Sequence, residues 1–303
     1  MNEKIAQIET IIARRAGRDI SYMSKWAKGN LKKAAESILC TPNAHVGILT
    51  GFYIEYADPP SPEPDGLGGM AHMATGLASI GVAVSVITDA PCAKAVWAVV
   101  DALPVRVDLE VASMSERSVR GLRQSLQQGE RPITHLIAIE RVSPAADGKP
   151  HRANGWDMTR QTAPLHLLFE DDGWQRPWTT IGIGDGGNEI GMGSLPKDLA
   201  ARIPNNVAAT IPADHLLVAG VSNWAGYGLI AAMACLNPAL APELLHHLNR
   251  EMDHRFLKVA VEVGQVVDGD GVGIRGRPMM SVDRIPWEQH AALLEELVAV
   301  VKS

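Results

Sequence analysis

Five short apolar segments, separated by helical patterns, constrain the fold of this chain more than any other feature. Each is apolar on both faces, as strands buried between two layers of helices are. They are VGILTG (46–51), VAVSVITD (82–89), THLIAIE (134–140), TTIGIGD (179–185) and HLLVAG (215–220). This alternation predicts an α/β protein with a mostly parallel, doubly wound sheet and helices on both of its faces.

The segments between the strands carry the apolar period of amphipathic helices. Helices are expected at 68–80, 92–102, 116–128, 196–203, 223–236 and 286–301. The first forty residues have the same period, so two further helices without chemistry of their own are expected there. The sequence therefore predicts an N-terminal helical segment, 1–44, followed by an α/β catalytic domain, 45–303.

Polar residues gather where the predicted strands end. In chain order they are Thr50 and Gly51, Asp89, Glu140 and Arg141, Asp185, and Ser222 with Asn223. Open α/β sheets bind ligands outside the carboxyl ends of their strands, so one site assembled from distant segments is expected. Two long loops, 53–69 and 141–157, leave the same side, and long loops in a compact domain are usually functional.

The glycine-rich segment 179–196 raises the question of nucleotide binding. It contains the G-x-G-x-x-G spacing of a dinucleotide site at Gly182, Gly184 and Gly187. That fingerprint belongs to the first strand–helix unit of a dinucleotide fold, whereas this one comes deep in the chain. Asp185 and Glu189 would also repel a pyrophosphate. No nucleotide cofactor is therefore expected.

The same loop carries hard oxygen ligands. Asp185, Asn188 and Glu189 lie within a short span, as a Mg²⁺ or Mn²⁺ site requires. Glu140, from the neighbouring predicted strand, completes the expected metal ligands as Glu140, Asp185 and Glu189. The alternative is that Asp185 caps a following helix and Glu189 completes a capping box.

Composition and charge exclude several classes of function. A formal net charge of −6 argues against a general nucleic-acid surface. The three cysteines form no C-x-x-C pair and fit a reducing compartment. The acidic, interrupted N-terminal segment and the lack of a long apolar run lead us to expect neither a secretory signal nor a membrane span. A cytoplasmic protein that acts on a small molecule is expected, with no nucleic-acid or membrane partner, and a homo-oligomer is left open.

Five blocks of the sequence resemble the D-glutamate cyclase family, formerly a domain of unknown function. They are GIGDGGNEIGMG (182–193), IER…AADG (139–148), TGF…PEPDGLGG (50–69), VAGVSNWAGYGLIAAM (218–233) and VDGDGVGIRGRPMMSVD (267–283). The resemblance implies that D-glutamate, an amino acid, is the substrate and closes to 5-oxo-D-proline and water. The reaction class is a carbon–oxygen lyase (hydro-lyase), and the family is associated with a divalent metal in an acidic pocket.

The implied reaction assigns a role to each acidic candidate. A divalent cation on Glu140, Asp185 and Glu189 would polarise the γ-carboxyl group as a Lewis acid. One of these carboxylates, or His151, would remove a proton from the amine as general base. Glu63 and Asp65, in the motif PEPDG, either reach the pocket or form a solvated turn.

Other residues are expected to hold the substrate. Arg141 suits the α-carboxylate, because a guanidinium binds a carboxylate with two hydrogen bonds. Backbone N–H groups of Gly186 and Gly187 would stabilise the oxyanion. The remaining expected contacts are Thr50, Gly51, Asp65, Asp147, Asn188, Ser222 and Asn223. The late Asp268, Asp270 and Asp283 either border the site or, as is favoured, lie in a solvated glycine-rich loop.

One loop departs from the family pattern. The family has A-G-R before A-A-D-G, where this chain has Val142, Ser143 and Pro144. Arg152 and Asn154 stand in exchanged order relative to the family's N-M-R-G. A metal-dependent lyase or hydrolase for another small carboxylate is therefore an alternative, as is a non-catalytic protein that binds a metal or an amino acid.

Overall fold

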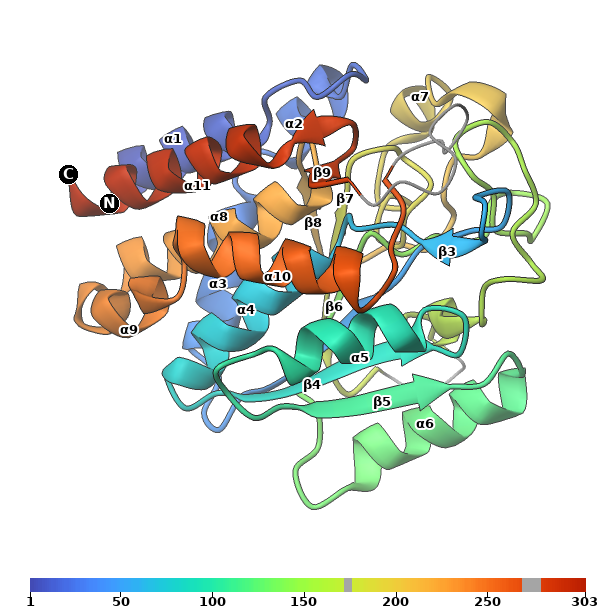
Figure 1. Cartoon of the computed structure of the whole chain (residues 1–303), viewed down its shortest axis with the longest axis horizontal. Coiled ribbons are helices and arrows are strands. Elements are labelled where there is room, and N and C mark those ends of the chain that lie inside the picture. Colours follow the sequence, from blue (N-terminus) through green and yellow to red (C-terminus); the bar gives the residue numbers. More distant parts are fainter. Residues whose placement is uncertain (172–175, 269–278) are drawn as a thin grey trace.

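A computed structural model describes residues 1–171, 176–268 and 279–303 (Figure 1). Residues 172–175 and 269–278 lie outside the described residues, and most of the block 267–283 falls there. Six parallel strands form the central sheet: β1 His45–Thr50, β4 Ala83–Asp89, β5 Asp108–Ala112, β6 His135–Ile139, β7 Thr179–Gly184 and β8 His215–Val218. The predicted α/β class with a parallel, doubly wound sheet is confirmed.

The strand order is β5-β4-β1-β6-β7-β8, so the chain builds outward from β1 first in one direction and then in the other. The reversal falls between β1 and β6, which are hydrogen-bonded neighbours. Ligands of doubly wound sheets bind at the crevice that such a reversal opens at the carboxyl ends of the strands. The topology therefore places a site beside Thr50 and Glu140, the residues at the ends of these two strands.

The edge strand β5 is absent from the sequence-based prediction. Its sequence, DLEVA, places two acidic residues among its apolar ones, and only Ala112 of its five residues is buried. An edge strand pairs on one side and faces solvent, so its side chains carry little of the apolar signal that marks a central strand.

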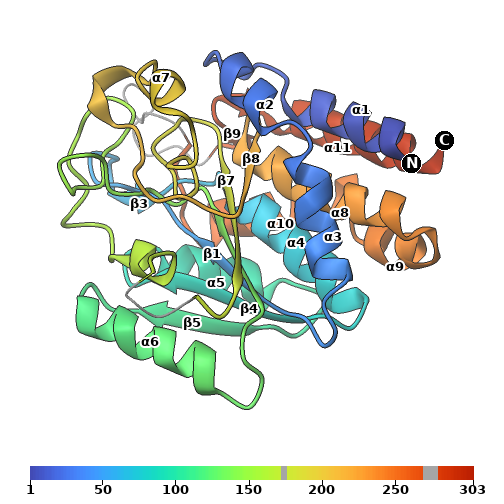
Figure 2. The same ribbon diagram turned by 180° about the vertical axis from the view of Figure 1, so that it is seen from behind.

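Alternate side chains of each strand enter two cores on opposite faces of the sheet. Ile48 of β1 and Ile137 of β6 join the larger core, whereas Leu49 and Leu136 join the second. The larger core includes residues from α1 Asn2–Ile12, α3 Asn30–Leu39, α4 Leu67–Ser79, α5 Ala93–Asp101, α8 Ser222–Leu236, α10 Arg250–Glu262 and α11 Trp287–Lys302. Helices α5 and α10 lie in front of the sheet in Figure 1 and behind it in Figure 2.

The second face has fewer helices. There α6 Glu116–Gln128 and the 3₁₀ helix η1 Leu165–Leu168 cover the middle of the sheet. The face of β8 that carries Leu216 and Val218 packs in a third hydrophobic cluster. This cluster includes residues from α2 Ser21–Ala27 and α7 Lys197–Ala200. Three helices precede β1 where the sequence predicted two, and α9 Ala241–His246 and α10 were not predicted.

Within the described ranges, no single helix combines the length and the apolarity of a membrane span. One sharply bent pair, Ser222–Leu236 with Pro238–His246, meets that criterion only jointly.

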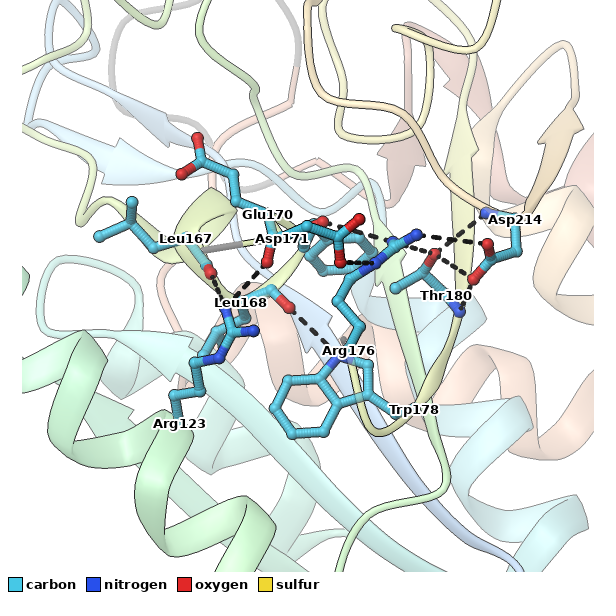
Figure 3. A network of polar contacts seen from close by, with 10 residues as sticks. Arg123, Leu167, Leu168, Glu170, Asp171, Arg176, Trp178, Thr180 and Asp214 are labelled. Atoms are coloured by element: carbon cyan, nitrogen blue, oxygen red, sulfur yellow. Dashed lines mark hydrogen bonds and ion pairs between the residues drawn. The ribbon is translucent and has the colours of Figure 1, made fainter. Parts of the chain in front are cut away.

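Two arginines fasten the long connection between β6 and β7 to the sheet (Figure 3). Arg123 of α6 donates to two backbone carbonyl oxygens of the connection, at 2.7 and 2.9 Å. Arg176 binds the carboxylates of Asp171 and Asp214 at 3.0 and 3.3 Å, and the Thr180 hydroxyl at 2.9 Å. Asp214 also accepts the Thr180 N–H at 2.8 Å, which ties the starts of β7 and β8 together.

Candidate active site

Six carboxylates from four segments meet beyond the carboxyl ends of β6 and β7. This acidic cluster comprises Glu63, Asp65, Glu140, Asp185, Glu189 and Asp283. Oxygens of Glu140, Asp185 and Glu189 lie within 4.8 Å of one another. Oxygens of Asp65, Asp185 and Asp283 do the same, so Asp185 belongs to both groups of three. The three expected metal ligands are thus brought together.

The backbone places Glu140 and Asp65 side by side. Glu140 follows β6 with a φ of +46°, a left-handed conformation that turns the chain at the strand end. Gly66 packs against it: a β-carbon there would lie 2.6 Å from the Thr50 hydroxyl oxygen and 2.8 Å from Cβ of Glu140. Glycine therefore lets the loop before α4 approach the ends of β1 and β6, and this brings in Asp65.

The glycine loop after β7 folds around the Glu189 carboxylate. Glu189 is fully buried and accepts the N–H groups of Asp185, Gly186 and Gly187 at 3.1, 2.7 and 2.8 Å. A β-carbon on Gly184 would lie 2.7 Å from this carboxylate. The glycines therefore make room for the buried Glu189 carboxylate. In this described segment no helix begins before Lys197, so neither Asp185 nor Glu189 caps a helix, and the helix-capping alternative is wrong.

Burial and mutual repulsion raise the pKa of four carboxyl groups in this cluster. Burial, followed by the nearby Asp283 carboxylate, raises the pKa of Glu63, Asp65 and Asp185 well above the usual range. Burial, with Asp65 next, does the same to the pKa of Glu140. Such groups favour a protonated form or a bound cation.

Two arginines border the cluster. Arg18, between α1 and α2, donates to Asp185 at 2.8 Å. Arg152 packs its guanidinium over the rings of Tyr56 and Phe52, with centroid distances of 4.5 and 5.7 Å. Both line a cavity of about 40 Å³ together with Phe52, Glu63, Glu140, Ala153, Asn154, Asn188 and Asp283. The cavity thus has carboxylates and guanidinium groups in its wall.

Residues 8–298 match the family described as D-glutamate cyclase-like, C-terminal. The match covers nearly the whole chain. This chain belongs to the D-glutamate cyclase-like family. The resemblance found in the sequence is confirmed.

A curated relative from Homo sapiens is named D-glutamate cyclase, mitochondrial. It is 28% identical over 331 aligned positions, which cover 99% of this chain and 52% of the relative. The chain therefore spans about half the length of the curated relative it matches. The relative's name refers to mitochondria, and the cytoplasmic location expected for this chain stays a prediction.

Several residues expected to contact substrate pack around the cluster of this D-glutamate cyclase-like protein. Asp65 accepts the N–H groups of Ser222 and Asn223 at 3.2 and 3.1 Å, capping α8. The Ser222 hydroxyl donates to Glu140 at 2.5 Å. The buried Thr50 hydroxyl has no hydrogen-bond partner among the described residues. Asn188 lines the cavity and donates to the carbonyl oxygen of His151 at 2.9 Å.

Other expected residues point elsewhere. The Arg141 guanidinium is buried in an ion pair with Asp89 at 2.5 Å and donates to the carbonyl oxygens of Gly51 and Ala163 at 2.8 and 2.9 Å. Its two terminal nitrogens thus donate to protein groups, and Nε has no hydrogen-bond partner among the described residues. The Asp147 carboxylate, largely exposed, pairs with the His151 imidazole at 2.9 Å, in the loop after β6. The N–H groups of Gly186 and Gly187 are occupied by Glu189 rather than open to an oxyanion.

Four residues of the site were missed or left undecided by sequence reasoning. Arg18 has no local signal, because it lies in a turn between helices without an evident motif. Arg152 was visible as a departure from the family pattern. Glu63 reaches the cavity, and Asp283 belongs to the cluster rather than to a solvated loop. A two-residue turn between β9 Ser281–Val282 and β10 Ile285–Pro286 presents Asp283.

The raised pKa values predict how stability depends on pH. A carboxyl group whose pKa is raised by folding stabilises the folded protein in its protonated form. This stabilisation is complete below the unfolded pKa of about 4. It is lost as the pH rises through the folded pKa. We expect the free energy of unfolding in EDTA, measured from urea midpoints, to fall between pH 7 and 8. Burial lowers the pKa of His135 and His166 to about 4, so both are neutral in that interval.

Saturating Mn²⁺ should remove this fall, because a cation favours the ionised carboxylates. A rise in metal-free stability between pH 7 and 8 would contradict the prediction.

Proposed function

We propose that this chain is a carbon–oxygen lyase that closes D-glutamate to 5-oxo-D-proline and water, with a divalent cation in the acidic cluster. Two observations support the proposal. The chain belongs to the D-glutamate cyclase-like family over residues 8–298. The observation that carries the chemistry is the convergence of six carboxylates, with raised pKa values at four of them. Three of the six, Glu63, Glu140 and Asp283, line a cavity that also has arginines in its wall.

The donor set fits Mg²⁺ or Mn²⁺. All of the clustered ligands are carboxylate oxygens, which these hard cations prefer, and no sulfur is among them. Glu140, Asp185 and Glu189 would hold the ion, with Asp65 and Asp283 beside Asp185. When bound, the cation would act as a Lewis acid on a substrate carboxyl group and offset the negative charge of the cluster.

The protein's own carboxyl groups can move the protons of the reaction. The amine nitrogen of D-glutamate forms a bond to the γ-carboxyl carbon, one carbon–oxygen bond breaks, and the leaving oxygen departs as water. A carboxyl group with a raised pKa keeps its proton to a higher pH than a free one and can donate to that oxygen, whereas an ionised neighbour can take a proton from the amine. Glu63 lines the cavity, has a raised pKa and is not one of the three residues named for the cation, so it is suited to donate that proton.

Arg152 and Arg18 are suited to hold the α-carboxylate of the substrate. Arg152 lines the cavity, and its contacts with Tyr56 and Phe52 fix the plane of its guanidinium. A planar guanidinium binds a carboxylate with two parallel hydrogen bonds. This role, first assigned to Arg141, fits Arg152 better because Arg141 is committed to Asp89.

Mass spectrometry of a panel of amino diacids tests the proposal. The protein is incubated with D- and L-glutamate, D- and L-aspartate and D-2-aminoadipate, with Mn²⁺ or with EDTA. We expect loss of one water from D-glutamate alone, and only with the metal. Turnover of another member of the panel would assign a different substrate, consistent with the altered loop 141–157. Binding without turnover of any member would indicate a non-catalytic protein.

A further inference from the structure

The segment that carries Asp283 is an unusual turn. Asp283 and Arg284 both have positive φ, +51° and +61°, between the paired strands β9 and β10. Turns of this kind favour asparagine and glycine, because other side chains are strained there. Such conformations persist only where the surrounding structure holds them, and they concentrate at functional sites. Contacts outside the turn must therefore hold it.

His290, in the first turn of α11, is hydrogen-bonded to this hairpin. Its side chain is buried, and Nε2 lies 3.1 Å from the carbonyl oxygen of Val282 and 3.2 Å from that of Ile285. These carbonyl groups belong to the residues immediately before and after the turn. Asp268 holds the same hairpin from another side, accepting the Arg284 N–H at 3.0 Å and the Ser281 hydroxyl.

Trp224 determines which imidazole nitrogen carries the proton. Its indole N–H lies 2.8 Å from Nδ1 of His290. An indole N–H can only donate, so Nδ1 must accept and Nε2 must carry hydrogen. That tautomer is the one able to donate to the two hairpin carbonyl groups. Trp224 follows Ser222 and Asn223 on α8, whose N–H groups Asp65 caps.

We propose that His290 is a positioning residue that holds the Asp283 carboxylate in the acidic cluster, and that Trp224 sets the imidazole tautomer this requires. The inference rests on the proposed function, because it concerns how the same cluster is assembled. Asp283 is a half-buried member of the cluster, and its oxygen lies within 4.8 Å of those of Asp65 and Asp185. Without the hydrogen bonds from His290, the strained turn relaxes and the Asp283 carboxylate moves away from the other acids of the cluster.

The test is a double-mutant cycle read by isothermal titration of the metal-free full chain with Mn²⁺. We expect His290→Leu to weaken Mn²⁺ binding about 10–100-fold, the range for residues that orient metal ligands. In the Asp283→Asn background the same change should have no further effect, because His290 acts through Asp283. Equal losses in both backgrounds, or no loss in either, would overturn the proposal.

Two variants separate positioning from general damage to the core. His290→Gln keeps a donor for the hairpin and an acceptor for Trp224, and should restore binding close to that of the wild type. His135→Leu removes an equally buried histidine at the opposite end of β6 and should leave Mn²⁺ affinity unchanged. If His135→Leu weakens Mn²⁺ binding as much as His290→Leu, the inference is wrong.

Hydrogen exchange supplies a readout that needs no metal. In EDTA, the amides of Ser281–Ile285 should exchange faster in His290→Leu than in the wild type, whereas those of α4 should not. A wild type that binds no Mn²⁺ would refute the metal part of the proposed function, and the exchange result would still decide the role of His290. Unchanged exchange in the hairpin would overturn that role.

Discussion

Replacing Glu140 with glutamine is expected to abolish turnover and Mn²⁺ binding while leaving the metal-free protein at least as stable as the wild type. The Glu140 carboxylate is buried among other acids, and its pKa is raised by burial and by Asp65. The amide introduced by Glu140→Gln would carry no charge, and its carbonyl oxygen could still accept from Ser222. The change therefore removes repulsion from the fold and a ligand from the site.

The expected loss of turnover in Glu140→Gln follows from the role of Glu140 as a ligand for the cation. Loss of a cation that supplies several kcal/mol of transition-state stabilisation lowers the rate by at least about 10²-fold. The measurements are D-glutamate turnover, Mn²⁺ titration and thermal unfolding in EDTA. Glu130→Gln, the same chemical change at an exposed acid, is the matched control and should alter none of the three. A Glu140→Gln variant that keeps its activity, or that unfolds without metal, would show that Glu140 serves the fold and not the chemistry.

Asp89→Ala is expected to cause the largest loss of stability among single changes near the site. Asp89 is fully buried, pairs with the buried Arg141 at 2.5 Å and accepts the Ala163 N–H at 3.0 Å. Removing one partner of a buried ion pair leaves an unpaired charge and costs about 3–5 kcal/mol. In a chain of this size that corresponds to a fall in Tm of roughly 5–8 °C.

Urea unfolding measures this loss, and Glu296→Ala is the control. Glu296 pairs with Arg14 at the surface, where a pair contributes about 0–1 kcal/mol. The double variant Asp89→Leu with Arg141→Met removes both charges and should recover much of the stability. If this double variant folds but its KM for D-glutamate rises sharply, Arg141 binds substrate after all.

Much of the architecture follows from local patterns. Five of the six sheet strands, and the helices at 68–80, 92–102, 116–128 and 223–236, were predicted, because a strand buried on both faces and an amphipathic helix carry their periods in the sequence. The missed strand β5 shows where this fails. The exposed edge strand carries charged residues among its apolar ones, and it is held by backbone hydrogen bonds to its neighbour β4.

The site divides in a similar way. Glu140 and Asp185 could be placed together because parallel strands end at one edge of a sheet, and Glu189 follows within the same loop. The arginines could not be placed in this way. Arg141 also stands at a strand end, yet Asp89 at the end of β4 accepts its guanidinium and buries it. Arg18 reaches the cavity from a turn whose sequence does not indicate it. Arg152 lies in a long loop that was expected to be functional, but the sequence did not show which way its guanidinium points.

Short-range periodicity was thus enough for the layers of the fold and for the acids at the strand ends, because both depend on spacings within a few residues. The direction of each long side chain depended on partners far away in the sequence. A guanidinium or imidazole turns toward whichever carboxylate or carbonyl oxygen the fold brings within hydrogen-bonding distance. Only the packed chain shows that Arg141 binds Asp89, that Arg18 binds Asp185, and that His290 holds the hairpin of Asp283.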